Sequence, residues 1–358
     1  MSIPFKSKIV TEDIDRIIAN DLPWEEFRGK TMLVTGASGM IPSYVLYTLL
    51  ALNDKKDMGM KIIALVRNRS KAEAILGDII DRDDVEFLVQ DVCEPLGYTE
   101  KIDYIFHGGS AARPSLHKSS PTSTIKSNIT GTFNLLDRAV KDEAKAFVLM
   151  SSSEVYGQVP EGVDKIEEDC YGAVNTLDPR SCYSEGKRAA ETICACYQAE
   201  FGIKVLTPRF AHIYGPGLQL NDGRVQADFA ANVMRGEDIV MNSDGSSVRA
   251  YTYVGDAVAG VFYALLKGDD IAYNIADNDS IISIKELAEF FTEARPELNL
   301  KVITKIQNDS SRSYFKAKFI GLDGSKLESL GWKAAVHAKE GCTRMIRFFE
   351  ERDSEEQH

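Results

Sequence analysis

Two short segments of the sequence carry side chains that could move a proton. Tyr183 and Lys187 are four residues apart in a helical pattern, so both lie on one face of the predicted helix. We expect the ammonium to favour the phenolate and to lower the pKa of Tyr183, which could then take a proton from a substrate hydroxyl. Ser152 and Glu154 follow a predicted strand, at the sheet edge where open α/β proteins place their chemistry.

A glycine-rich turn at residues 35–42 follows the first predicted strand and opens a helix. Such a turn lets the backbone approach a pyrophosphate, and the helix N-terminus supplies amide donors. Pro42 stands where a third small residue is usual, but its missing N–H would have no intrahelical partner, so we expect altered packing only. The turn predicts a bound dinucleotide, NAD or NADP, held by Gly36, Ser38, Gly39, Met40 and Ile41.

The ends of the next two strands bear on the choice of cofactor. Arg67 stands where an acidic residue usually binds the ribose hydroxyls of NAD. It could pair with the 2′-phosphate of NADP, and a solvated basic loop is an equally good interpretation. Asp91 and Val92 follow the third strand and could reach the adenine, whereas Asp91 could equally cap the turn.

Strands alternate with helices along most of the chain. Because the strands are apolar, we predict an α/β fold: a Rossmann-like doubly wound parallel sheet, covered on both faces, with a smaller C-terminal substrate-binding lobe. The expected strands are 31–35, 61–66, 85–89, 104–106, 146–150 and 204–207, and the expected helices are 12–20, 44–52, 121–140, 181–201 and 338–350. The expected domains are an N-terminal extension (1–28), a dinucleotide-binding domain (29–208) and a mostly substrate-binding lobe interleaved with it (209–358).

Composition excludes several classes of function. The 42 Lys and Arg residues against 54 Asp and Glu give a net charge of −12, which disfavours nucleic acid or an anionic membrane as a partner. No apolar run approaches the roughly 18 residues that span a bilayer, and residues 1–10 lack the apolar core of a signal peptide. The six cysteines show no metal-ligand spacing, so we predict no metal site and the reduced thiols of a cytoplasmic protein.

Together these motifs resemble the extended short-chain dehydrogenases/reductases of the NAD-dependent epimerase/dehydratase family, which modify nucleotide sugars. The resemblance rests on residues 35–39, Ser152, Tyr183 and Lys187, and it runs over about residues 30–335. Further similar segments are 107–114, with Gly108 beside the nicotinamide, then 128–132, 209–216, 221–225 and 249–256. The last two segments are most similar to UDP-glucuronate decarboxylases.

The resemblance implies roles for the matching residues. Tyr183 would deprotonate the sugar C4 hydroxyl as hydride passes to NAD+, Ser152 would complete the proton relay, and Lys187 would bind the nicotinamide ribose. NAD+ is the cofactor that the resemblance favours, whereas Arg67 favours NADP+. The implied substrate contacts are Ser153, His212, Asn221, Arg224 and Arg249. Arg224 and Arg249 could hold the diphosphate or form surface ion pairs, and we expect Arg209 around the same cleft.

Glu154 bears on the reaction. The 4,6-dehydratases of the family have an Asp-Glu pair here, whereas decarboxylases have Ser-Glu, as in Ser153 and Glu154. A 4-keto group β to a carboxylate is an electron sink, so loss of carbon dioxide needs little further help. We therefore expect UDP-glucuronate-decarboxylase-like chemistry with retained NAD(P). The alternatives are an epimerase, an NADPH-dependent keto-sugar reductase or a non-catalytic dinucleotide sensor, and Glu154 could instead cap the next turn.

Two departures from the family leave the sugar open. His212 stands where the family usually has asparagine, so it could sense a carboxylate or a hydroxyl, or simply form a hydrogen bond in the core. Residues 315–323 lack the Arg-x-Pro-Asp segment of the family. The helices at 122–140 and 182–201 resemble the pair through which the family dimerises, so we expect a homodimer.

Overall fold

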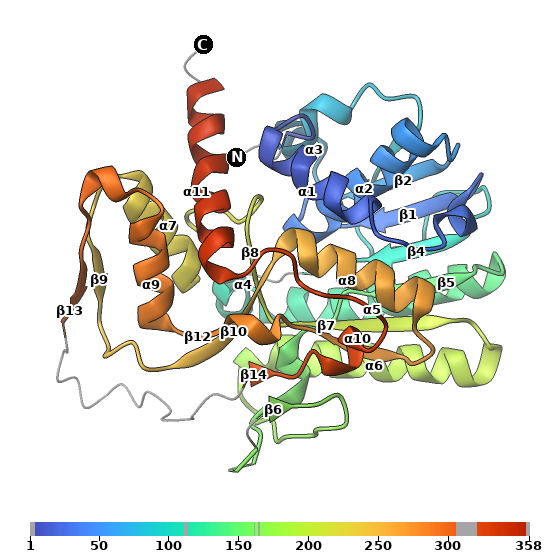
Figure 1. Cartoon of the computed structure of the whole chain (residues 1–358). Coiled ribbons are helices and arrows are strands. Elements are labelled where there is room, and N and C mark those ends of the chain that lie inside the picture. The colour runs from blue at the N-terminus through green and yellow to red at the C-terminus, as the bar shows by residue number, and fades with distance from the viewer. Residues whose placement is uncertain (1–3, 111–113, 161, 164, 306–320, 356–358) are drawn as a thin grey trace.

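A seven-stranded parallel sheet forms the centre of the computed structural model, which describes residues 4–110, 114–160, 162–163, 165–305 and 321–355 (Figure 1). The strand order is β11-β7-β5-β4-β1-β2-β3, so the order reverses between β1 and β4, as in a doubly wound sheet. The strands are β1 (Thr31–Thr35), β2 (Lys61–Val66), β3 (Val85–Val89), β4 (Tyr104–His107), β5 (Ala146–Leu149), β7 (Val205–Phe210) and β11 (Ala272–Ile275). Most of the segment 315–323 and part of the segment 107–114 lie outside the described residues.

Helices cover both faces of this sheet, and this confirms the predicted fold class (Figure 1). Alternate residues of β1 enter two cores: Met32 and Val34 pack in one, and Leu33 packs in the other. The first core includes α1 (Lys8–Ile18), α2 (Met40–Lys56) and α8 (Val254–Lys267), and the second includes α5 (Pro121–Lys141) and α6 (Cys182–Phe201). The expected full burial is wrong for β3, an edge strand with one neighbour, in which Val89 is 49% exposed.

A second group of short elements follows β7 and forms the smaller lobe. A three-stranded sheet contains β8, β10 and β12, and β9 pairs with β13. The chain returns to the large sheet through α8 and β11, so the two parts are interleaved. The bounds are β8 (His212–Tyr214), α7 (Val225–Met234), β9 (Ile239–Met241), β10 (Val248–Tyr253), β12 (Ile281–Ser283), α9 (Ile284–Glu293), β13 (Val302–Thr304) and α11 (Ala338–Glu355). Smaller elements are α3 (Arg69–Leu76), α4 (Pro114–Ser119), β6 (Lys165–Ile166), β14 (Gly321–Leu322) and α10 (Ser325–Glu328).

The N-terminal segment is built into the core. Its helix begins four residues earlier than predicted, because the Ser7 side chain accepts a hydrogen bond from the Val10 amide and caps it. Buried Asp13 on this helix accepts hydrogen bonds from Tyr44 of α2 (2.9 Å), Tyr253 at the end of β10 (2.7 Å) and Arg344 of α11 (2.7 Å). One carboxylate therefore joins four elements. None of the helices in the described part of the chain is long and apolar enough to cross a membrane.

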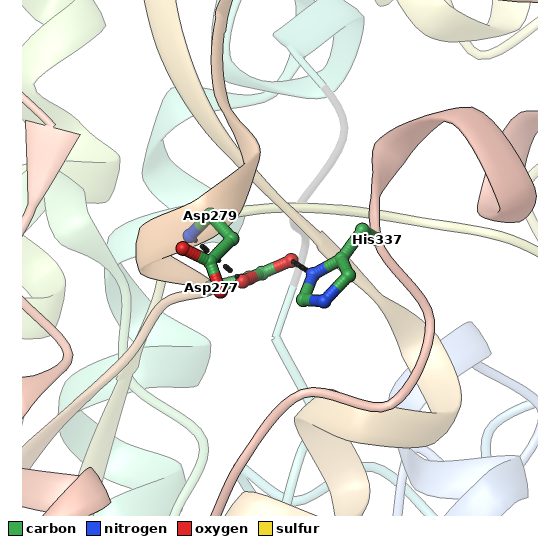
Figure 2. Close-up of side chains that lie close together, drawn as sticks. All are labelled: Asp277, Asp279 and His337. Carbon is green, nitrogen blue, oxygen red and sulfur yellow. Dashed lines mark hydrogen bonds and ion pairs between the residues drawn. The ribbon is translucent and has the colours of Figure 1, made fainter.

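A polar cluster anchors the segment that leads into α11 (Figure 2). Asp277, Asp279 and His337 present ligand-type atoms within 4.8 Å of one another. Both carboxylate oxygens of Asp277 already accept hydrogen bonds, one from the Asp279 amide and the other from the Ser280 hydroxyl, and the second also pairs with His337 Nδ1 at 2.9 Å. These hydrogen bonds anchor the chain where it leads into α11.

The His337–Asp277 pair makes stability depend on pH. The hydrogen bond to Asp277 raises the pKa of His337 above its ordinary value of 6.5. The contribution of the pair to the free energy of unfolding is therefore fully present below about pH 6.5, the ordinary pKa, and is lost as the pH rises through the folded-state pKa of His337. His337→Gln is expected to lower the free energy of unfolding at about pH 5.5 by no more than about 1 kcal/mol, because half of the side chain is exposed.

Urea denaturation at about pH 5.5 and about pH 9 measures this effect, since the difference between the two proteins should nearly vanish at the higher pH. A difference that stays constant with pH would contradict an ionic contribution of His337.

Candidate active site

One face of α6 carries three polar side chains at intervals of one turn. Lys187 Nζ donates a hydrogen bond to the Met150 carbonyl at the end of β5 (2.6 Å), and burial lowers the pKa of Lys187 to about 8 although Glu191 opposes the shift. Glu191 accepts a hydrogen bond from the Ser151 hydroxyl (2.5 Å). Tyr183 is the third of these side chains; it lies one turn before Lys187 on α6 and close to Ser152. The helix is therefore docked on the carboxyl ends of β5 and β7.

Tyr183 is buried close to Ser152, whose side chain lowers the pKa of the phenol. Burial raises the pKa of Tyr183, Ser152 and the charge of Arg224 lower it, and the charge of Glu154 raises it further. The expectation that Lys187 lowers this pKa is wrong for the structure as described. The Lys187 ammonium is 6.0 Å from the centre of the phenol ring and is directed to the Met150 carbonyl.

The predicted segment after β5 forms a single turn of 3₁₀ helix, Ser153–Tyr156. Ser152 caps this turn by accepting a hydrogen bond from the Glu154 amide (3.2 Å). The Glu154 carboxylate is half-exposed and lies 4.0 Å from the Arg180 guanidinium. Among the described residues no backbone amide of a following turn donates a hydrogen bond to the Glu154 carboxylate, so the alternative that Glu154 caps the next turn has no support there, and its charge acts on Tyr183. The structure brings Ser152, Glu154 and Tyr183 together as predicted.

Three of the predicted substrate residues also lie close together. His212 of β8 is opposite Tyr251 of β10, with ring centres 5.6 Å apart. Burial, then the charges of Arg249 and Arg224, lower the pKa of His212 to about 4, so its imidazole is neutral near pH 7. Arg224 also acts on Tyr183, which links this group to the proton-transfer residues. Arg224 pairs with Asp222 at 2.8 Å.

Asn221 lines a cavity that His212, Arg224 and Arg249 do not line. This cavity of about 510 Å³ is also lined by Gln219, the C-terminal end of α7 and Asp353 of α11. Ser153 is partly buried beside Ser152.

Sequence reasoning did not identify two buried polar groups in this region. The Tyr251 hydroxyl and Gln226 Nε2 have no hydrogen-bond partner among the described residues. Burial raises the pKa of Tyr251, so its hydroxyl stays protonated and can donate. Buried polar atoms are nearly always satisfied in folded proteins, so such groups suggest contact with a ligand. The sequence held one indication of them: Tyr251 lies two residues after Arg249, and Gln226 lies two residues after Arg224, both arginines being predicted substrate contacts.

The glycine-rich turn has the geometry that a dinucleotide requires. Gly36 has φ +65°, and a Cβ there would lie 2.7 Å from the Gly108 carbonyl oxygen. A Cβ on Gly108 would in turn lie 2.5 Å from the Pro42 ring, so the proline packs directly against the next loop. No side chain caps α2 at Gly39, and the intrahelical bonds start from the Ser43 amide. The amides of the first turn are therefore left for an anionic group, and the residues fit the predicted cofactor.

The predicted adenine side of this site is also assembled. Asp91 accepts a hydrogen bond from the Cys93 amide (2.9 Å), which lowers the pKa of Asp91, and the charges of Arg67 and Lys126 lower it further. Asp91 therefore does cap its turn, and exposed Arg67 lies within charge range of it. Val92 is buried below the turn. These positions suit binding of an adenosine and leave the 2′ position undecided.

Arg209 does not belong to a phosphate-binding cluster, contrary to our expectation. It is buried, and its guanidinium forms an ion pair with Glu191 at 2.7 Å. Its Nε and Nη2 donate to Glu191, and its Nη1 donates hydrogen bonds to the Tyr156 hydroxyl (3.1 Å) and the Glu168 carbonyl (2.7 Å). All of these contacts are within the protein, so Arg209 holds the chain around the site and does not face a ligand.

Comparisons with known proteins find one family and a set of similar sequences and structures. The model of the NAD dependent epimerase/dehydratase family matches residues 32–276. The chain is 33% identical over 322 residues to UDP-glucuronic acid decarboxylase 6 of Arabidopsis thaliana, covering 89% of this chain and 88% of that protein. It is 31% identical over 360 residues to UDP-glucuronic acid decarboxylase 1 of Xenopus tropicalis, covering 97% and 79%.

Two solved structures show the same fold. The UDP-glucose 4-epimerase of Thermotoga maritima, solved with UDP-glucose, gives a TM-score of 0.74 at 24% identity and covers 90% of this chain and 99% of that one. The dTDP-glucose 4,6-dehydratase of Bacillus anthracis, solved with NAD, gives 0.72 at 19% identity and covers 91% and 98%.

The Glu191–Arg209 pair should be essential for stability. Glu191→Gln is expected to lower the free energy of unfolding by about 3–5 kcal/mol, because it leaves the buried Arg209 charge without a counter-charge. Glu185→Gln on the same helix is the control, since its pair with Arg188 is partly exposed and 3.9 Å long, and its effect should stay below about 1 kcal/mol. Chemical denaturation of both variants measures the difference, and equal effects would refute the assigned role.

Proposed function

Because this chain belongs to the NAD-dependent epimerase/dehydratase family of enzymes, we propose that it oxidises a nucleotide sugar at C4 and then decarboxylates the 4-keto sugar. The substrate class is a nucleoside-diphosphate uronic acid, such as UDP-glucuronate. The observation that carries the proposal is that buried Tyr183 lies close to the turn formed by Ser152 and Glu154, so that both side chains act on the pKa of its phenol. The curated relatives named as UDP-glucuronic acid decarboxylases support the same reaction.

Each residue of this group has a defined task. Tyr183 takes the proton of the C4 hydroxyl, and Ser152 holds the phenol oxygen in place. NAD(P), when bound, accepts the C4 hydride and later returns it. Lys187, with a pKa of about 8, still carries positive charge at neutral pH and would bind the ribose hydroxyls beside the nicotinamide. The turn residues identified above, with Arg67, Asp91, Val92 and Gly108, would hold the rest of the cofactor.

The later steps occur on the 4-keto sugar. The bond between C5 and the carboxylate breaks, its electron pair passes into the C4 carbonyl as an enolate, and carbon dioxide leaves. A proton is then added at C5, and we assign its delivery to Glu154, whose exposed carboxylate takes the proton up from solvent and passes it to C5. In the last step Tyr183 would return its proton to the C4 oxygen, while reduced NAD(P), when bound, would supply the hydride to C4.

Positive charge for the substrate comes from Arg224 and Arg249, which would hold the diphosphate. His212 is neutral near pH 7, so it would recognise the sugar or phosphate by hydrogen bonding and not by charge. The unpartnered Tyr251 hydroxyl and Gln226 amide are placed in the same region and would complete the polar contacts. This set suits a large polar ligand.

We further propose a cytoplasmic homodimer. The packed pair α5 and α6 presents three neighbouring aromatic rings, Phe133, Tyr197 and Phe201, and Phe133 and Phe201 are 42% and 50% exposed. A second copy of the pair would cover this apolar surface. All six cysteines are free thiols, which supports a reducing compartment.

Tyr183→Phe tests the base. Turnover is expected to fall by at least about 10²-fold, because the variant cannot accept the C4 proton, while cofactor binding stays unchanged. Tyr171→Phe is the control, since this tyrosine is 78% exposed on a loop and should have full activity. The reduced nicotinamide formed in a single turnover is measured by absorbance, and normal turnover in Tyr183→Phe would reject the assignment.

Glu154→Gln tests the step after oxidation. C4 oxidation should proceed, seen as reduced nicotinamide, while the decarboxylated product falls by about 10²-fold because its proton donor is lost. Mass spectrometry of a panel of nucleotide sugars is the readout. Wild-type protein should remove one carbon dioxide from UDP-glucuronate. Loss of water would show a dehydratase, and isomerisation without a change in mass would show an epimerase.

A further inference from the structure

His117 stacks on the proposed catalytic base. This residue of α4 lies face to face with Tyr183 of α6, with ring centres 4.5 Å apart and planes inclined by 14°. Both rings are buried, His117 with 4% and Tyr183 with 8% of its surface exposed. The contact joins two segments that are far apart in the sequence.

We propose that His117 is a positioning residue that blocks the swing of the Tyr183 ring towards it and thereby fixes the place of the Tyr183 hydroxyl. The inference rests on the proposed function, in which Tyr183 takes the substrate proton. Ser152 lies close enough to the phenol to lower its pKa, but a side chain on one side leaves the ring able to swing about the Cα–Cβ bond of Tyr183. A flat ring stacked against one face removes this freedom, so one position of the hydroxyl remains.

The histidine is itself held in place by the start of α6. The Cys182 thiol is 3.8 Å from the His117 carbonyl oxygen and donates a hydrogen bond to it. Cys182 is the residue immediately before Tyr183, so the backbone of His117 and the backbone next to the tyrosine are tied together. The stack and this bond act on the same short stretch of α6. Movement of α4 would therefore move the phenol directly.

Residues other than His117 supply the charges that act on the phenol. Glu154 raises the pKa of Tyr183 and Arg224 lowers it, and the Lys187 ammonium lies 6.0 Å from the ring centre. The role that we assign to His117 is the contact of its flat ring with the phenol. Phenylalanine, which has a flat ring and no ionisable group, should be able to replace it.

The test compares His117→Ala with His117→Phe. In His117→Ala, kcat should fall by about 10- to 100-fold with KM changed by less than about 3-fold, because a misplaced catalytic group slows chemistry by about this factor. In His117→Phe, kcat should remain within about 3-fold of wild type, and the pH profile should be unchanged. A fully active His117→Ala, or a His117→Phe as slow as His117→Ala, would overturn the proposal.

A second measurement does not depend on activity. Tyr183 is replaced by 3-fluorotyrosine, and its ¹⁹F resonance is recorded in each folded variant. Removal of the stacked ring in His117→Ala should shift and broaden the resonance, whereas His117→Phe should keep it narrow. An unchanged resonance in His117→Ala would overturn the stack itself. If instead Tyr183→Phe is fully active while the resonance responds, the proposed function fails and the stack stands.

Discussion

The buried ion pair between Glu191 and Arg209 is the interaction on which the arrangement of the site depends. Arg209 comes from β7 and Glu191 from α6, and both charges are almost fully removed from water. Two such charges are stable only when they meet with good geometry, so the pair fixes the helix against the strand. Lys187 lies about one turn and Tyr183 about two turns before Glu191 on the same helix, and their places at the sheet edge follow from the ion pair.

The same arginine organises the chain on its other side. Its Nη1 holds the Tyr156 hydroxyl and the Glu168 carbonyl, and Tyr156 in turn donates to Asn274 of β11 (2.5 Å). The turn that carries Ser152 and Glu154 ends at Tyr156, so it is fixed by this network. The proposed base and the residues around it are thus supported by one connected set of buried polar contacts.

Asp13 likewise holds two elements together, α2 next to the glycine-rich turn and β10 of the small sheet. Of these two elements, β10 carries Arg249 and Tyr251. Burial raises the pKa of Asp13, and Arg344 and the two tyrosine hydroxyls oppose the shift. A catalytic cycle with hydride transfer needs cofactor and sugar at a fixed separation, and this carboxylate ties together the elements that would hold them.

The sequence by itself determined the alternating strands and helices, the glycine-rich turn and the Tyr183–Lys187 spacing, because these depend on local periodicity and backbone conformation. It also determined the family, through motifs that the comparisons confirm. Tertiary structure alone decided the partners of the long polar side chains. The sequence predicted Arg209 as a phosphate ligand, whereas in the folded chain it pairs with Glu191. Lys187 donates to the Met150 carbonyl, and His117 stacks on Tyr183. Such contacts join residues distant in sequence, and no local pattern records which of several possible charges or rings will meet.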